Sequence, residues 1–201
     1  MRAQAHTLEG IVASFLLITG LVFALQATAV TPLSASTSSQ HIENQERAIA
    51  EGVLAAALEN GTLEVAPVFW DNRTDYLRFH NTSSRQYYVD NLQPNLTFTN
   101  MLERNFGDAG IAYNVNIVHM TETGAERERR LVYRGVPSDN AVTASRIVTL
   151  YDDDVLYDHE GNPTTYTVSK GADEGKFYMS DAAPESAVFN VVKIEVVVWR
   201  M

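Results

Sequence analysis

The feature that most constrains this chain is an uncharged and almost wholly apolar run near its N-terminus. Residues 10–42 contain no Asp, Glu, Lys or Arg, and residues 10–25 are apolar apart from Ser14 and Thr19. Continued to residue 30, the run reaches roughly the 20 residues that a helix needs to cross about 30 Å of hydrocarbon with its backbone hydrogen bonds satisfied internally. We therefore predict a transmembrane helix within residues 5–33 and a separate fold after it.

The charges that flank this run indicate its orientation. Arg2 and the terminal amine precede it, and the nearest charge after it is the acidic Glu43. The positive-inside rule then leaves the N-terminus in the cytoplasm and the residues after about 33 on the outer side. Glu9 stands at the entrance of the run. A carboxylate at mid-bilayer costs about 2.5–3.5 kcal/mol, so one at this place needs shallow insertion or a cationic partner.

The residues around Glu9 resemble the class III signal peptide of archaeal type IV pilins and related pilin-like proteins. In that family a prepilin peptidase cuts a short basic leader on the cytoplasmic side, the hydrophobic helix is retained, and a Glu is fifth in the mature chain. Cleavage between Gln4 and Ala5 would make Glu9 the fifth residue. Residues 5–9, Ala-His-Thr-Leu-Glu, are similar to the Phe-Thr-Leu-Ile-Glu type of start, although Ala3-Gln4 stands where Gly is commoner.

This resemblance implies a role for Glu9 and a set of partners. Residues 1–4 would be the leader peptide, and the helix after them would pack against the helices of other pilin-like subunits in the membrane lipid. The carboxylate of Glu9 could then neutralise the α-amine of a neighbouring subunit's Ala5, because two groups that are each costly in hydrocarbon become tolerable as a pair. The alternative is a Glu9 that lies at the headgroup level without a partner.

A second processing route competes with this one. Ala27-Thr28-Ala29 is a small-x-small site after an apolar stretch, so a conventional signal peptidase could cut after Ala29 and release the rest of the chain. The apolar run is longer than the usual core of about 7–15 residues, and its short leading segment contains Glu9. Both observations favour retention of the helix.

Residues 34–61 are predicted to form a hinge and a stalk. Pro32 favours an end or kink of the first helix, and the Ser/Thr-rich residues 34–39 are poor helix formers. Helix is expected to resume after Ser38 or Ser39 and to stop at Asn60-Gly61. One face of this amphipathic stalk carries the apolar residues Ile42, Ile49, Val53, Leu54, Ala57 and Leu58. The broken helix would extend about 75 Å at 1.5 Å per residue.

Residues 62–201 are predicted to form a β-rich, extracytoplasmic head domain. β-Branched and aromatic segments separated by turn residues predict strands at residues 63–70, 75–80, 111–117, 129–136, 142–151 and 188–199. The last of these is the most apolar and is expected at the centre of the sheet. Helical spacing is present over residues 98–109. The fold class is therefore α+β: a long, kinked, partly transmembrane N-terminal helix followed by an antiparallel sheet packed on the stalk.

The amino-acid composition excludes several classes of function. The absence of cysteine excludes disulfides, Cys-zinc sites and thiol nucleophiles. A net charge of −10 gives no electrostatic footprint for nucleic acid. Of the 15 basic residues 12 are Arg, and this suppression of Lys alongside excess carboxylate resembles the surfaces of proteins from halophilic archaea.

No catalytic or cofactor motif is present, so we expect no enzymatic activity and no cofactor. The five histidines are scattered without ligand spacing. Several aromatic residues could form a binding platform, although core packing is the favoured interpretation. These residues are Phe69, Trp70, Tyr76, Tyr87, Tyr88 and Trp199.

Two further patterns mark surface sites. Asp152, Asp154 and Asp158, with Asp153, Glu160 and Asn162 near them, are weak candidates for a Ca²⁺ site; the alternative is a solvated hairpin tip at residues 157–163. Four sequons are candidates for N-glycosylation, which requires an exposed site outside the cytoplasm. Their acceptors are Asn60, Asn72, Asn81 and Asn95.

These observations favour a pilin-like subunit of a type IV pilus or a related secretion or assembly system, a minor pilin or pseudopilin rather than a major one. It would be a single-pass protein of the cell membrane with an extracellular head domain. If the subunits polymerise, it would be part of a surface filament. The alternative is a singly anchored or signal-peptidase-released extracytoplasmic binding or sensor domain. An exported hydrolase has no supporting motif.

Overall fold

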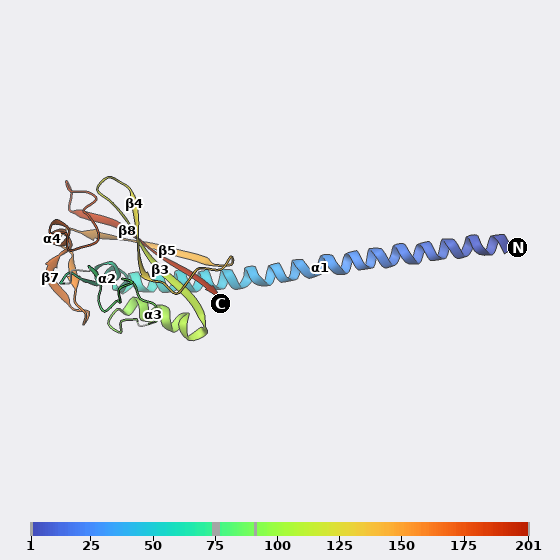
Figure 1. The fold of residues 1–201 in the computed structure, drawn as a ribbon, viewed down its shortest axis with the longest axis horizontal. Helices are drawn as coiled ribbons and strands as arrows, with labels where there is room; N and C mark the ends of the chain where they lie inside the picture. The colour runs from blue at the N-terminus through green and yellow to red at the C-terminus, as the bar shows by residue number, and fades with distance from the viewer. Residues whose placement is uncertain (1, 74–76, 91, 201) are drawn as a thin grey trace. The chain divides into compact units, whose positions relative to one another are not determined.

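The computed structural model describes the backbone of residues 2–73, 77–90 and 92–200, and the side chains of these residues except 2–5 and 27–39. The chain divides into two compact units, residues 1–42 and 43–201. It is a mixed α+β protein in which an N-terminal apolar helix precedes an antiparallel β-sheet region, as predicted (Figure 1).

Helix α1 (Arg2–Glu59) is assigned without interruption over 58 residues, through Pro32 and the Ser/Thr-rich residues 34–39. The predicted end of the first helix and its restart after residue 38 are therefore wrong. A proline inside a helix costs about 3 kcal/mol, and Ser or Thr costs well under 1 kcal/mol each. Helix that is already formed on both sides extends through such residues without a second, costly nucleation. The predicted stop is confirmed, because α1 ends at Glu59 and Gly61, two residues later, adopts a left-handed φ of 71°.

Residues 62–79 depart from the predicted hairpin. Helix α2 (Thr62–Val68) replaces the strand expected at residues 63–70, because its buried residues Leu63, Ala66 and Pro67 recur at helical spacing. Only β1 (Trp70–Asp71) and β2 (Arg78–Phe79) pair antiparallel, with Trp70 opposite Phe79. Of the connection between them, residues 74–76 lie outside the described part of the chain.

A four-stranded sheet organises the second unit. It consists of β3 (Ile111–Met120), β4 (Glu126–Val132), β5 (Val142–Tyr151) and β8 (Val188–Arg200) in the order β4-β3-β8-β5, with every neighbouring pair antiparallel. The central position predicted for the C-terminal strand is confirmed. The strand expected at residues 129–136 begins and ends earlier, because the turn that precedes it closes between Thr121 and Ala125 around the left-handed Gly124.

Shorter elements complete this unit. Helix α3 (Thr97–Asn105) and the 3₁₀ turn η1 (Gly107–Ala109) occupy the segment that showed helical spacing. Strands β6 (Val155–Tyr157) and β7 (Pro163–Thr167) form a hairpin whose tip is the predicted loop at residues 157–163, and α4 (Val168–Asp173) follows.

The core of the second unit lies between the C-terminal part of α1 and one face of the sheet. Ala50, Val53, Leu54 and Ala57 of α1 are buried in one cluster with alternate residues of β3 and β8. This confirms the centre of the predicted apolar stripe, whereas Leu58 is exposed. Complete burial of a leucine such as Leu54 contributes about 2 kcal/mol.

One ion pair joins α1 to the C-terminal end of β8. Arg200, near the end of β8, donates from Nε to Oε1 of Glu46 on α1 at 2.6 Å. The Glu46 side chain is only 4% exposed, whereas that of Arg200 is 60% exposed. The carboxylate has therefore lost its water and depends on the guanidinium, which keeps most of its own.

This asymmetry predicts unequal costs for removing either partner. Arg200→Gln leaves a buried carboxylate unpaired and should lower the free energy of unfolding by about 3 kcal/mol. Glu46→Gln leaves an exposed guanidinium and should cost about 1 kcal/mol. Urea denaturation of the full-length protein in detergent, followed by circular dichroism, measures both. If both variants lost the same free energy of unfolding, or if Glu46→Gln lost more, the buried carboxylate would not be the group that depends on the pair.

Candidate functional site

The apolar helix segment His6–Gln26 is the first candidate site. It has 21 residues, a mean hydropathy of 2.2 and none of its most apolar window buried inside the structure. Leu17 and Phe23 are 75% and 74% exposed, for example. The segment is long and apolar enough to cross a membrane, and a signal sequence at an N-terminus has the same properties. An exposed apolar surface of this extent requires lipid or other helices around it.

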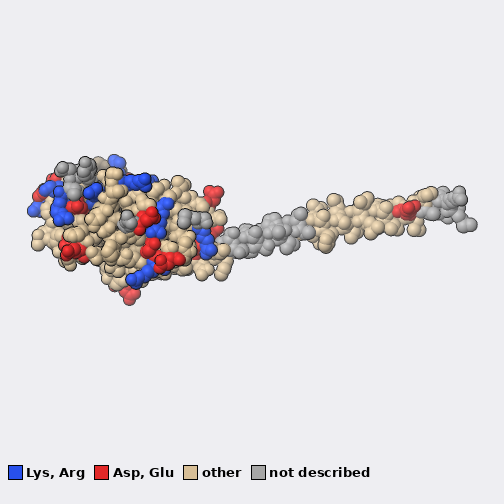
Figure 2. Space-filling view, turned by 60° about the horizontal axis from the view of Figure 1, so that its bottom comes forward, with Lys and Arg blue, Asp and Glu red and all other residues tan. Residues whose placement is uncertain are grey.

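Glu9 is the one acidic residue of this segment, and it is highly exposed. Its side chain is 80% exposed, and its Oε2 lies 3.6 Å from Nδ1 of His6, one helical turn earlier. Figure 2 shows a single acidic group on this otherwise uncharged stretch of helix. No role was predicted for His6, although its i,i+3 spacing from Glu9 is visible in the sequence. A protonated His6 can supply part of the cationic partner that a carboxylate at the membrane surface needs.

Two of the three hydroxyl residues of the segment, Ser14 and Thr19, donate hydrogen bonds within the helix. Ser14 donates from Oγ to the carbonyl oxygens of Gly10, at 2.5 Å, and Ile11, at 3.1 Å. Thr19 donates from Oγ1 to the carbonyl oxygen of Phe15 at 2.7 Å. Neither hydroxyl therefore requires a partner from outside, which is the condition for placing such groups in hydrocarbon.

Both proposed cleavage points lie within α1. Gln4 and Ala5, which flank the first, and Ala29, which precedes the second, belong to the backbone of α1. Their side chains lie outside the described residues.

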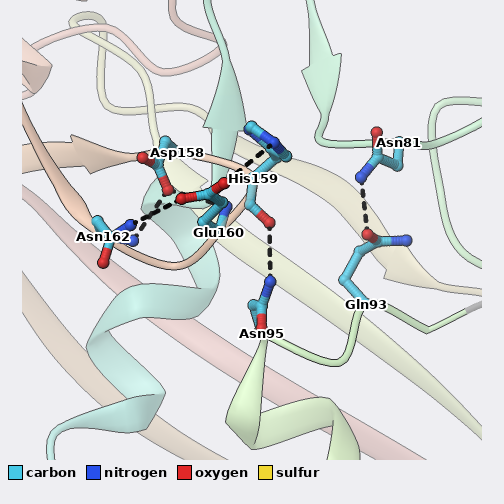
Figure 3. Close-up of polar contacts among 7 residues, drawn as sticks. All are labelled: Asn81, Gln93, Asn95, Asp158, His159, Glu160 and Asn162. Carbon is cyan, nitrogen blue, oxygen red and sulfur yellow. Dashed lines mark hydrogen bonds and ion pairs between the residues drawn. The ribbon is translucent and has the colours of Figure 1, made fainter.

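Three of the four sequon asparagines are exposed on the head, and Asn72 is half-buried. Asn60 accepts hydrogen bonds through Oδ1 from the backbone N and the Oγ1 of Thr62, at 3.2 and 2.6 Å. Asn81 and Asn95 instead donate from Nδ2, the atom that a glycan would modify, to Gln93 and to the carbonyl oxygen of His159 (Figure 3). Of the three exposed acceptors, Asn60 is therefore the one whose amide nitrogen is least engaged with the described residues.

The acidic candidates for Ca²⁺ are used to build turns. Asp158 accepts from the backbone N of Glu160 and of Asn162, both at 2.9 Å (Figure 3). These bonds, that from Asn162 first, lower the pKa of the Asp158 carboxyl. Asp154 accepts from the backbone N of Tyr151 at 2.8 Å, and Asp152 keeps one buried oxygen without a partner. Among the described residues, no three His, Asp or Glu side chains are grouped to hold a metal ion.

The aromatic residues considered as a platform contribute mainly to the core. Phe69, Trp70, Tyr88 and Trp199 are buried, which confirms the packing interpretation for them. Tyr87 is half-buried and stacks edge-on with Tyr133. Tyr76 lies outside the described residues.

Two histidines that had no assigned role are buried in the head. His80 is hydrogen-bonded through Nε2 to the carbonyl oxygen of Tyr157 at 2.8 Å, which joins the segment after β2 to the β6–β7 hairpin. Burial lowers the pKa of His80 below its ordinary value, and the bond to Tyr157 and the negative charge of Asp71 oppose that shift only in part. His119, on β3, is also buried.

The lowered pKa of His80 predicts acid sensitivity of the head. The folded state binds this proton less readily than the unfolded chain, so stability is complete above the unfolded pKa of about 6.5 and declines as the pH falls below it. The melting temperature of His80→Gln should therefore fall less than that of the wild type between about pH 7 and pH 5. Exposed His41, as His41→Gln, is the control and should keep the wild-type dependence. A His80→Gln variant as acid-sensitive as the wild type would exclude this role.

Comparisons with known proteins give a family and nothing more specific. The model of DUF7288, described as a family of unknown function, matches residues 2–198. No curated protein and no solved structure matches the chain significantly. The family match spans both the apolar helix and the head, so the two occur together as one architecture.

Proposed function

The chain belongs to the DUF7288 family, and we propose that it is a membrane-anchored, non-enzymatic pilin-like subunit of a type IV pilus or a related secretion or assembly system. In this proposal it is a minor pilin or pseudopilin of a halophilic archaeon. The observation that carries the proposal is an unburied apolar helix of 21 residues with one exposed carboxylate near its N-terminal end. An anchor alone needs the apolar residues; it does not need the acid.

The acid has a physical purpose when helices of several copies pack together. After removal of residues 1–4 by a prepilin peptidase, the free α-amine would belong to Ala5, four residues before Glu9. The carboxylate of one subunit then pairs with the amine of the next, and the pairing fixes the axial register of the two helices. His6 adds a second basic group one turn from Glu9. In the assembly, neighbouring helices cover part of the apolar surface that lipid would otherwise cover.

The surface of the head is consistent with a position outside the cell membrane. Its exposed sequon acceptors Asn60, Asn81 and Asn95 are available to an extracytoplasmic glycosylation system. The excess of carboxylates keeps such a surface hydrated in concentrated salt. The N-terminus would remain in the cytoplasm.

A singly anchored or released binding domain is the second candidate. The Ala27-Thr28-Ala29 sequence is a site at which a signal peptidase could release the rest of the chain. A recess in the head, lined by basic and aromatic residues, supports a binding role whichever way the chain is anchored.

The first residue of the mature protein tests the proposal. N-terminal sequencing or intact-mass measurement of the protein from its native membrane should give Ala5, because a prepilin peptidase cuts ahead of the apolar helix. Val30 would establish signal-peptidase release, and Met1 or Arg2 a simple anchor. Either of these results would overturn the pilin-like assignment.

Substitution of Glu9 tests the assembly role separately. Glu9→Gln keeps the size of the side chain and removes the charge, so the protein should stay in the membrane while its cross-linking to other pilin-like subunits falls at least tenfold. Glu51→Gln, the same change at an exposed position of α1 outside the apolar segment, is the matched control. Cross-linking of Glu9→Gln at the control level would remove the proposed role of this carboxylate.

A further inference from the structure

The head contains a recess of about 440 Å³ between the β3–β4 end of the sheet and the segment that follows α4. Its volume lies in the range of small-molecule sites. Three basic side chains face it from the two strands, and apolar and aromatic side chains form the opposite wall. The basic residues are His119, Arg127 and Arg129, and the opposite wall consists of Ala172, Phe177, Tyr178 and Met179.

Strand pairing places the three basic groups on one face. Arg127 lies opposite His119, and Arg129 lies opposite Ile117 in the β3–β4 ladder. Because side chains alternate along a strand, Arg127 and Arg129 project to the same side as the buried Ile117, whereas Glu128 projects to the other. Glu128 is the one acidic residue that lines the recess, and its carboxylate is thereby directed away from the two guanidinium groups.

The guanidinium groups in the recess form no ion pair with the described residues. Neither Arg127 nor Arg129 forms an ion pair there, although the chain carries 25 acidic residues and a net charge of −10. Nδ1 of His119 is buried without a hydrogen-bond partner. Burial and then the charges of Arg129 and Arg127 lower the pKa of His119, which keeps this ring neutral beside them. A compensating anion from outside would complete the cluster.

Two side chains of the recess, Arg129 and Tyr178, are held in place before any ligand arrives. Arg129 donates from Nη2 to the carbonyl oxygen of Leu77 and to Oε1 of Gln86, and its guanidinium lies 5.0 Å from the centre of the Trp70 ring. Tyr178 donates from its hydroxyl to the carbonyl oxygen of Pro67 at 3.0 Å. A site whose side chains are already fixed loses less entropy on binding.

Asn190 of β8 hydrogen-bonds to residues on both sides of the recess. It donates from Nδ2 to the carbonyl oxygens of Met120 and Ser180, at 2.8 and 3.0 Å, and accepts from the backbone N of Met120. This one side chain therefore holds the segment after α4 against β3 and fixes the distance between the two walls.

The basic surface continues around the edge strand. A second hollow of about 340 Å³ shares Arg129 and Glu128 with the first and is also lined by Arg85 and Arg130. Arg130 lies opposite Asn116, on the other side of the sheet from Arg129, so the two hollows adjoin across β4. A ligand with more than one acidic unit can reach both.

From these observations we propose that the recess binds an acidic saccharide, with the carboxylate of a uronic acid unit on Arg127 and Arg129 and its ring against Phe177 and Tyr178. Arginine accommodates a carboxylate with two parallel hydrogen bonds, and apolar walls with a few placed polar groups are typical of sites for ring-sized ligands. The ligand is a free uronate or a uronate unit of a polysaccharide. This proposal concerns residues 43–201 and does not depend on the mode of anchoring or assembly.

Binding of defined sugars to the full-length protein in neutral detergent tests the proposal. In a buffer without carboxylates, isothermal titration with glucuronate should show saturable binding, since both charge and ring are present. Glucose, which lacks the carboxylate, and acetate, which lacks the ring, should each bind at least tenfold more weakly. An oligogalacturonide that binds more tightly than glucuronate would indicate a polysaccharide source, and the reverse a free uronate.

Two substitutions locate the site. Arg127→Gln should weaken glucuronate binding at least tenfold without lowering the melting temperature, because Arg127 is exposed and makes no hydrogen bond with the described residues. Arg104→Gln, the same change on the exposed surface of α3, should bind as the wild type does. The proposal is overturned if glucuronate fails to bind the wild type at millimolar concentration, if Arg127→Gln binds it equally well, or if inorganic phosphate binds as tightly as glucuronate.

Discussion

The exposure of apolar side chains over residues 6–26 is the constraint on which the organisation of this protein depends. None of the most apolar window of this segment is buried inside the structure. Each Å² of apolar surface left in water costs about 25 cal/mol, so a helix of this length in water would be unfavourable by more than most domains gain from folding. Lipid or the helices of other molecules must cover it. The polar groups of the segment suit such surroundings, because Ser14 and Thr19 bond to their own backbone and Glu9 has His6 beside it.

The second unit meets the same requirement internally. The C-terminal part of α1 buries Val53 and Leu54 against the sheet, and β8 supplies the alternating residues of its centre. Two polar side chains inside this core have specific partners. Glu46 is held by Arg200, and Asn190 joins two segments through both ends of its amide. These groups determine which segments meet at the ends of the sheet, where the proposed saccharide recess lies.

Local patterns in the sequence predicted part of this arrangement and failed where context decides. Alternation over residues 111–117 and 142–151 is a local property of a half-buried strand, so both strands were predictable. Residues 63–70 are rich in β-branched and aromatic residues, but only their burial against the head selected a helix for most of them. Pro32 disfavours helix locally, and the helical residues on both sides outweigh it. The pairing of His6 with Glu9 follows from helical spacing and could have been derived.

The sequence by itself determined that a helix long enough to span a membrane precedes an α+β head with a central C-terminal strand, since hydropathy and periodicity are carried by neighbouring residues. It also singled out Glu9, because an acid beside an apolar run is visible without a fold. Only the tertiary structure decided that Asp154 and Asp158 bond to backbone N–H groups, and that Arg127, Arg129 and His119 share a recess with Phe177 and Tyr178. The recess joins residues far apart in the chain, and the packing of the segment after α4 against β3 and β4, which no local pattern encodes, brings them together.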